Sequence, residues 1–241
     1  NYTGIGTTMK QHNAKVIWNR SLNNDCVHLG LDCGPDFSVA APGQFVMVRI
    51  DDSLNPLLRR PFSIAGIIDT PQGKRVELLI KVVGKGTQAL SLLGPEDSVD
   101  LIGPLGHGFR IPKQAERIFL AAGGIGVAPI RYLATELIGQ GMNPASCHLF
   151  MGGRSSGDLL CRNDFDALGI GVTITTDDGS DGDQCLLTDP LEVTAQDTRP
   201  DIIFACGPHG MLVCMAGIAE RLAIPCQVSL ETMMACGMGA C

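Results

Sequence analysis

The second half of the chain repeats one pattern four times: a short apolar run ends in a turn rich in glycine or aspartate. The runs are RIFLAA, CHLFMGG, VTITTDDGS and PDIIFACGP. Helical stretches follow the first and last runs, and the first helix has an apolar face made of Ile130, Leu133, Ala134, Leu137 and Ile138. Alternating strands and helices form a parallel sheet, whose ligands bind at the carboxyl ends of the strands. Residues 112–225 are therefore expected to form an α/β domain.

Residues 1–111 have a different rhythm, in which strand follows strand. GQFVMVRI, KRVELLIKVV and DSVDLIG are short, rich in β-branched residues and bounded by glycine, proline or aspartate. Only residues 87–93 read as a helix, with Thr87 as the expected N-cap. Closely spaced strands with turns between them predict an antiparallel β-barrel. The expected fold is therefore a barrel followed by an α/β domain.

Composition excludes several classes of function. Hydrophobic residues make up 45% of the chain and charged residues 18%, as in a compact globular protein. The net charge of −7 gives no general attraction to nucleic acid or anionic lipid, and no apolar run is long enough to span a bilayer. Several of the ten cysteines, such as Cys147, lie in apolar runs where a reduced thiol is ordinary. We expect a cytoplasmic protein with no nucleic-acid partner and no membrane insertion.

The stretch RRPFSIAG is a candidate ligand site within the barrel half. Arg60 can make a forked contact to a phosphate, Phe62 offers a ring for stacking, and Ser63 offers a hydroxyl for a ring heteroatom. An ordinary strand with an exposed arginine is the alternative. Further along the barrel half, LIKVVGKGTQAL runs from a strand through two glycines into a helix, whose open amides suit a pyrophosphate. A plain glycine turn with a threonine cap is the alternative there.

The turn AAGGIGVAPI departs from the usual dinucleotide fingerprint. Gly124 and Gly126 supply G-x-G, but Pro129 occupies the place of the third glycine. Glycines permit close approach of a ligand to the backbone, and Pro129 suits the first turn of a helix. The alternative is a tight turn with no ligand.

Two further strand ends carry groups that can bind a nicotinamide nucleotide. Asp177 and Asp178 can accept hydrogen bonds from ribose hydroxyls and leave no positive charge for a 2′-phosphate, which favours NAD over NADP. A solvated turn is the alternative. Cys206 ends the last run, where a nicotinamide can lie beside it, and a buried structural cysteine is the alternative.

Cys236 and Cys241 have the spacing C-x4-C among small residues, which is the opening of the plant-type [2Fe–2S] pattern. A chance pair of free thiols is the alternative. That pattern needs four cysteines, and the others in the chain do not supply the missing spacing. Residues 226–241 are therefore expected to begin an incomplete cluster segment, with two further ligands beyond residue 241.

The order RRPFS, GKGT, GPLGHGF, GGIGVAP, TDDGS, CGPHGM and ETMMACGMGAC resembles the electron-transfer subunits of type B dihydroorotate dehydrogenases, within the ferredoxin–NADP reductase superfamily. The resemblance runs from about residue 14 to 241. It implies a Greek-key FAD-binding barrel over 1–111, an NAD-binding α/β domain over 112–225, and the start of a [2Fe–2S] segment over 226–241. Phe62 departs from the family pattern, because many relatives have an aliphatic residue there.

The resemblance also implies which residues bind the cofactors, and it implies no catalytic acid or base. The flavin and its phosphates are assigned to Arg60, Pro61, Phe62 and Ser63, lined by Leu79, Ile80 and Lys81, with the pyrophosphate at Gly86 and Thr87. The nicotinamide nucleotide is assigned to Gly123, Gly124, Gly126, Asp178, Cys206, Gly207 and Pro208. Cys236 and Cys241 are assigned to the cluster.

The implied function is electron transfer between NAD and an FMN-containing catalytic subunit that oxidises dihydroorotate in pyrimidine biosynthesis. The electrons pass through FAD and a [2Fe–2S] cluster, and the assembly is a heterotetramer with two copies of each subunit. Two alternatives stay open at this stage. The same cofactors can serve a hydrogenase, a sulfide dehydrogenase or a transhydrogenase, or the chain can sense a nucleotide without turnover.

Overall fold

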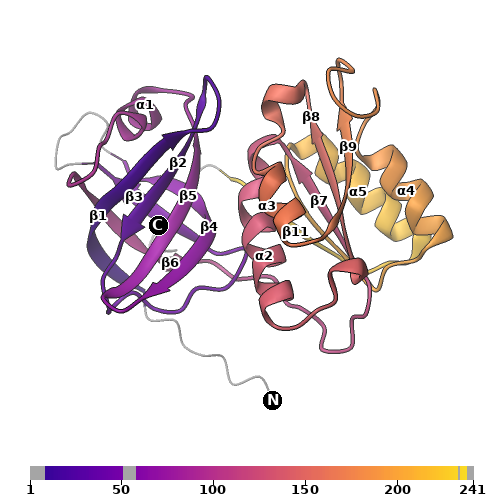
Figure 1. Cartoon of the computed structure of the whole chain (residues 1–241), viewed down its shortest axis with the longest axis horizontal. Coiled ribbons are helices and arrows are strands. Elements are labelled where there is room, and N and C mark those ends of the chain that lie inside the picture. Colours follow the sequence, from indigo (N-terminus) through magenta and orange to yellow (C-terminus); the bar gives the residue numbers. More distant parts are fainter. Residues whose placement is uncertain (1–8, 51–57, 233, 238–241) are drawn as a thin grey trace. The chain divides into compact units, whose positions relative to one another are not determined.

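The computed structural model describes residues 9–50, 58–232 and 234–237. These residues form two compact units (Figure 1). One unit contains the described residues up to Gly108 together with those from Thr232 onward, and the other is Phe109–Glu231. The divisions thus fall after residues 108 and 231, whereas the sequence placed them after residues 111 and 225.

In the first unit, six strands of the described residues close into an antiparallel barrel, as predicted. Their spatial order is β1-β2-β5-β4-β3-β6, in which β2 pairs with β5 rather than β3 and so makes a Greek-key connection. The bounds are β1 (Lys10–Ser21), β2 (Cys26–Asp32), β3 (Phe45–Arg49), β4 (Arg60–Thr70), β5 (Gly73–Lys81) and β6 (Ser98–Leu105).

The barrel strands form because their apolar side chains alternate toward a common core. In β1, His12, Ala14 and Val16 are buried while the residues between them are exposed. The middle of β5 is buried on both sides from Val76 to Ile80, as expected of a strand covered on both faces. The alternating β1 thus has one buried face, whereas β5 is covered on both faces.

Helix α1 (Lys85–Ser91) lies between β5 and β6 and begins two residues before Thr87. The prediction that Thr87 is the N-cap is therefore wrong. The Thr87 hydroxyl instead accepts hydrogen bonds from the amides of Val83 (2.9 Å) and Gly84 (3.1 Å) and donates one to the Gly84 carbonyl (3.0 Å). Thr87 lies inside the first turn of α1 and stabilises the loop that leads into the helix.

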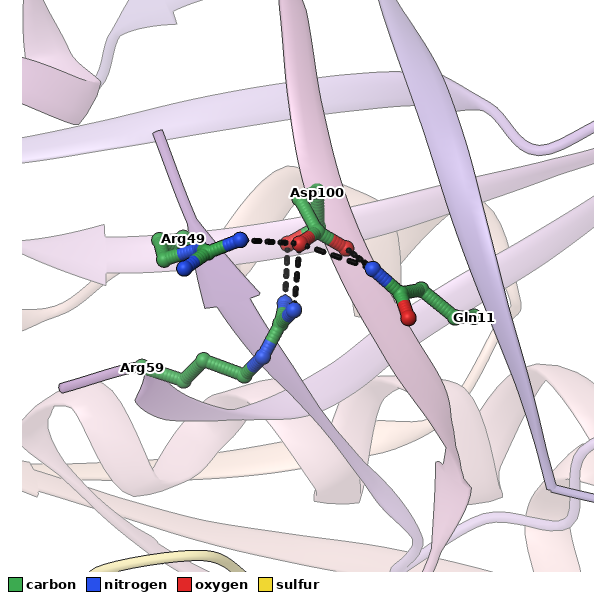
Figure 2. A network of polar contacts seen from close by, with 4 residues as sticks. All are labelled: Gln11, Arg49, Arg59 and Asp100. Carbon is green, nitrogen blue, oxygen red and sulfur yellow. Dashed lines mark hydrogen bonds and ion pairs between the residues drawn. The ribbon is translucent and has the colours of Figure 1, made fainter. Parts of the chain in front are cut away.

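Asp100 of β6 is the centre of a polar network on the barrel (Figure 2). Its carboxylate accepts hydrogen bonds from Gln11 of β1 (2.9 and 3.0 Å), Arg49 of β3 (3.0 Å) and Arg59, which directly precedes β4. Arg59 also donates to the Asp100 carbonyl at 2.8 Å. Burial raises the pKa of Asp100, but the hydrogen bonds from Arg59 and Gln11 outweigh it, so the pKa is held below its usual value. The network thus links three strands and the residue before a fourth.

Asp100→Asn is expected to lower the free energy of unfolding by about 2 kcal/mol at neutral pH, because two guanidinium groups lose their counter-charge. A depressed pKa in the folded state stabilises the fold above the ordinary carboxyl value of 3.8, and this stabilisation is lost as the pH falls through the folded-state pKa. The difference in unfolding free energy between wild type and variant should therefore shrink below pH 3.8. Urea unfolding of both proteins at neutral pH and below pH 3.8 measures this difference.

Asp69→Asn is the matched control, since the Asp69 side chain is 80% exposed and its ion pair with Lys74 is a surface contact. We expect its effect to stay below about 1 kcal/mol at either pH. An Asp100→Asn variant as stable as wild type at neutral pH would show that the network contributes nothing to folding.

The second unit is a parallel sheet of five strands among the described residues, in the order β11-β10-β7-β8-β9. Helices α4 and α5 pack together on one face and α2 covers the other (Figure 1). The bounds are β7 (Ile118–Gly123), α2 (Val127–Gly139), β8 (Cys147–Gly153), α3 (Arg162–Ala167), β9 (Gly171–Thr176), α4 (Thr188–Asp197), β10 (Ile202–Cys206), α5 (His209–Leu222) and β11 (Cys226–Ser229). The predicted α/β domain is confirmed.

The core of this sheet follows the apolar runs in the sequence. Phe119, Phe150 and Ile203 from three adjacent strands pack with Leu191 of α4 and Met215 of α5. Residues 226–229, expected to open the cluster segment, instead form β11 and pair with β10. Among the described residues, no helix combines the length and apolar character needed to cross a membrane.

Candidate functional site

In the first unit, Arg60 lies against the start of α1. A Cβ atom placed on Gly86 would be 3.3 Å from the Arg60 Nε. The helix makes its first hydrogen bond from the Gln88 amide to the Gly84 carbonyl (2.8 Å), so the helix itself leaves the amides of residues 85–87 unused. The Arg60 side chain therefore lies next to backbone N–H groups that the helix leaves unused, and binding of a pyrophosphate there stays a prediction. A side chain at position 86 would have to displace Arg60 by a few tenths of an ångström.

The two arginines of RRPFS have different tasks. Arg59 is engaged with Asp100, whereas Arg60 donates to the Leu58 carbonyl and lies beside Gly86. Adjacent residues of an extended chain point to opposite sides, which explains the division. Thr87 contributes differently from the prediction, because its hydroxyl already binds the loop; its amide is the group that the helix leaves available.

The remaining flavin residues lie on neighbouring strands, β4 and β5. Pro61 is exposed, and Phe62 and Ser63 are half-buried. The antiparallel pairing of β4 with β5 ends at Ile64 and Leu78, so both predicted sets continue from the same end of this ladder. The second set is Leu79, Ile80 and Lys81, and its place at the flavin stays a prediction.

The side chains of that second set are not equally available. Ile80 is fully buried and Leu79 is 3% exposed, so these two residues offer a ligand mainly their backbone. Lys81 is half-buried and its Nζ lies 3.8 Å from Asp25 Oδ2. A planar ligand over β5 would therefore contact backbone and the Lys81 stem rather than apolar side chains.

In the second unit, three glycines at the carboxyl end of β7, Gly123, Gly124 and Gly126, have distinct roles. A Cβ on Gly126 would lie 2.6 Å from the carbonyl carbon of Cys206 and 2.7 Å from the amide nitrogen of Gly207. A Cβ on Gly123 would lie 2.7 Å from Pro208 Cδ. These two glycines thus let the turns after β7 and β10 pack together. Gly124 has a φ of +53° and nothing within 4 Å of an added Cβ, so it is the position open to a ligand.

Cys206 ends β10 as a buried thiol. It is 1% exposed, and burial, followed by the negative charge of Glu231, raises its pKa to about 12. A neutral, enclosed thiol fits the structural alternative, and its place beside a nicotinamide stays a prediction. Gly207 and Pro208 follow at the same edge of the sheet, and Pro208 is the N-cap of α5.

Asp178 lies on an exposed turn after β9. Its carboxylate accepts a hydrogen bond from the Ser180 amide (2.9 Å), and hydrogen bonds from Ser180 lower its pKa, so it is an anion available to ribose hydroxyls. The Asp178 amide donates to the Arg154 carbonyl at 3.1 Å. This backbone contact puts a cationic residue in the turn next to Asp178.

Two arginines that follow β8 were missed by sequence reasoning, and both are ion-paired. Arg154 directly follows β8 and its Nε lies 3.1 Å from Asp158 Oδ2, while Arg162 Nη1 lies 3.2 Å from Asp181 Oδ2. Arg154 was detectable as a residue at a strand end, where ligands gather. Asp158 partly neutralises the charge of Arg154, and the preference for NAD over NADP stays a prediction.

Cys236 lies in a bend that belongs to the first unit. It is half-buried and not in a disulfide, and the following Gly237 has a φ of +70° and packs against Met47 of β3. Cys241 lies outside the described residues. Within residues 9–50, 58–232 and 234–237, no group of three or more His, Cys, Asp or Glu side chains is placed to hold a metal ion.

Comparison with known proteins supplies independent information on both units. Residues 15–110 match the family model described as oxidoreductase FAD-binding domain, and residues 120–216 match oxidoreductase NAD-binding domain. A protein of Desulforamulus reducens called dihydroorotate dehydrogenase B (NAD(+)), electron transfer subunit, is 36% identical over 96% of this chain and 87% of its own length. The protein of that name in Listeria monocytogenes is 38% identical over 97% of this chain and 88% of its own length.

Among solved structures, one is described as an NADH-dependent reduced ferredoxin-NADP oxidoreductase in a study of flavin-based electron bifurcation. It matches with a TM-score of 0.81 and 28% identity, over 98% of this chain and 82% of its own length. A ferredoxin reductase of carbazole 1,9a-dioxygenase matches with a TM-score of 0.74 and 22% identity, over 93% of this chain and 70% of its own, and so supports the fold alone.

Proposed function

This chain belongs to the electron-transfer subunits of NAD-dependent dihydroorotate dehydrogenase B, and we propose that it carries electrons between NAD and a catalytic subunit that oxidises dihydroorotate in pyrimidine biosynthesis. It is an NAD-dependent flavin oxidoreductase with an FAD-binding barrel and an NAD-binding α/β domain. The observation that carries the proposal is the meeting of Arg60 with the open amides at Gly86 and Thr87, inside the segment that matches an FAD-binding domain.

The residues of the barrel fit FAD. Arg60 neutralises the diphosphate charge, and the backbone amides of Gly86 and Thr87 donate to its oxygens. Phe62 offers a ring and Ser63 a hydroxyl to the isoalloxazine, beside the backbone of Leu79–Lys81 on the neighbouring strand. When bound, FAD supplies hydride exchange with a nicotinamide and single-electron exchange with a one-electron carrier. No side-chain acid or base is needed for this chemistry.

The α/β domain fits a nicotinamide nucleotide at the carboxyl edge of its sheet. Gly124 allows close approach of the diphosphate to the backbone, and the Asp178 carboxylate accepts hydrogen bonds from ribose hydroxyls. Gly123 and Gly126 act indirectly, because they allow the turns after β7 and β10 to pack together. The domain orients the nucleotide, and its residues take no part in bond making.

For the cluster, we assign Cys236 and Cys241 as two of four thiolate ligands, with the other two further along the chain. Thiolates are the ligands that such a cluster uses, and Cys236 lies in a bend with a left-handed glycine, which suits a loop that wraps a [2Fe–2S] cluster. The partner is proposed to be an FMN-containing subunit, in a heterotetramer with two of each chain. A cytoplasmic location is consistent with the described cysteines, none of which is in a disulfide.

NADH is expected to bind the FAD-loaded chain at least ~10-fold more tightly than NADPH, because Asp178 repels a 2′-phosphate and Asp158 offsets the charge of Arg154. Asp178→Asn should reduce the ratio of the two affinities, because it weakens NADH binding and removes the repulsion of the NADPH 2′-phosphate. Stopped-flow reduction of the flavin at several concentrations of each donor gives both constants. Asp166→Asn, at an exposed aspartate of α3, is the matched control. Equal affinity of the wild type for the two donors would contradict the assignment of Asp178.

A further inference from the structure

The C-terminal end of α1 is held by a side chain from a distant strand. The carboxamide nitrogen of Asn19, on β1, lies 3.1 Å from the Leu90 carbonyl oxygen, 3.1 Å from that of Ser91 and 2.8 Å from that of Leu93. The last carbonyls of a helix have no partner within the helix, so they need donors from elsewhere. Asn19 therefore acts as a C-terminal cap that is 71 to 74 residues away in sequence.

The orientation of the Asn19 carboxamide is fixed by what surrounds it. Only the nitrogen can face three carbonyl oxygens, because the carboxamide oxygen has no proton to donate. The Oδ1 atom is buried and has no hydrogen-bond partner among the described residues. A leucine would fill the same space without leaving an unsatisfied acceptor, so a purely space-filling role would favour leucine over asparagine. The N–H donors of its carboxamide are therefore what asparagine contributes at this position.

Helix α1 depends on such contacts for its position. It has seven residues, which is too short to be stable by itself. Leu90 anchors it to the core at 1% exposure, while Lys85, Gln88 and Leu92 on its outer side are exposed. Its first turn carries Gly86 and Thr87 beside Arg60, about 10 Å from the end that Asn19 holds. A shift or rotation at one end of so short a helix moves the amides at the other.

We propose that Asn19 is a positioning residue for the FAD diphosphate: it fixes α1 so that the amides of Gly86 and Thr87 face the same point as the Arg60 guanidinium. This inference rests on the proposed function, since it takes FAD as the ligand of the barrel. Asn19 acts through α1 and need not contact the flavin itself.

The test compares two flavins that differ in the group at issue. Apoprotein of wild type, Asn19→Leu and Asn19→Ser is titrated with FAD and with riboflavin, which lacks any phosphate, and quenching of flavin fluorescence gives each dissociation constant. Asn19→Leu should raise the dissociation constant of FAD about 10-fold and change that of riboflavin by less than about twofold. Asn19→Ser keeps one donor, so its dissociation constant for FAD should lie between those of wild type and Asn19→Leu. Asn13→Leu, at an exposed asparagine of the same strand, is the matched control and should change neither.

Hydrogen exchange adds a second measurement without turnover. In Asn19→Leu, the amides of residues 88–93 should exchange faster while those of β2 and β5 stay protected. An equal loss of affinity for both flavins, or unchanged FAD affinity, would overturn the role of Asn19; if Asn19→Leu does not fold, Asn19→Ser decides in the same way. A wild-type chain that binds neither flavin would instead overturn the proposed function, and the inference with it.

Discussion

Arg60→Ala is expected to weaken FAD binding roughly 100-fold, about 2.7 kcal/mol. The figure lies near the upper end of the 1.5–3 kcal/mol or so that a hydrogen bond to a charged group contributes. The physical reason is that Arg60 supplies a full positive charge where α1 offers only backbone dipoles, beside Gly86. Titration of the apoprotein, followed by flavin fluorescence, measures the constant, and flavin retained after gel filtration gives an independent check.

Two further variants sharpen this result. Arg60→Lys keeps the charge but loses the planar fork, so we expect an intermediate loss of about 10-fold. Arg20→Ala removes a barrel arginine that instead lies over the Trp18 ring, 5.5 Å from its centre, and should leave FAD affinity unchanged. Wild-type affinity in Arg60→Ala would remove Arg60 from the flavin site.

Gly126→Ala is expected to destabilise the second unit by about 3 kcal/mol or more, because its Cβ would meet the backbone of Cys206 and Gly207 at 2.6–2.7 Å. Backbone atoms of two packed turns cannot move aside as a flexible side chain can. The free energy of opening, measured by hydrogen exchange of the β7 and β10 amides, reports on this unit alone.

The neighbouring Gly124 gives a matched comparison. Gly124→Ala places a Cβ in open space but in a left-handed backbone conformation, so it should cost only about 1–2 kcal/mol of stability. Because Gly124 is the open position of the turn, the same variant should lower NADH affinity. If Gly126→Ala proves less destabilising than Gly124→Ala, the packing explanation of these glycines is wrong.

Short-range patterns predicted the architecture well. The apolar runs ending in glycine or aspartate became β7, β8, β9 and β10, and the close-spaced strands of the first half became the barrel. Periodicity of two or of 3.6 residues is local, so it is visible in sequence. The prediction of Thr87 as the N-cap was wrong. The Thr87 hydroxyl accepts hydrogen bonds from the Val83 and Gly84 amides, and the helix begins two residues before Thr87.

Features that depend on contacts distant in sequence were beyond the reach of the sequence pattern. Nothing in GGIG distinguishes Gly126, which packs on Cys206, from Gly124, which is open. Likewise, the sequence singled out Arg60 as a ligand for phosphate, but the bond of Arg59 to Asp100, 41 residues away, was not visible in it. Asn19 read as an ordinary strand residue because its acceptors lie more than 70 residues away.

The central claim is that this chain exchanges electrons between NAD and a bound flavin. The most direct test is anaerobic mixing of the FAD-loaded chain with NADH while the flavin absorbance is followed. We expect that the absorbance bleaches, that about one NADH is consumed per FAD when the flavin is the sole acceptor, and that an artificial acceptor restores the colour. NADH that binds while the flavin stays oxidised would contradict the claim and leave a nucleotide-sensing module in its place.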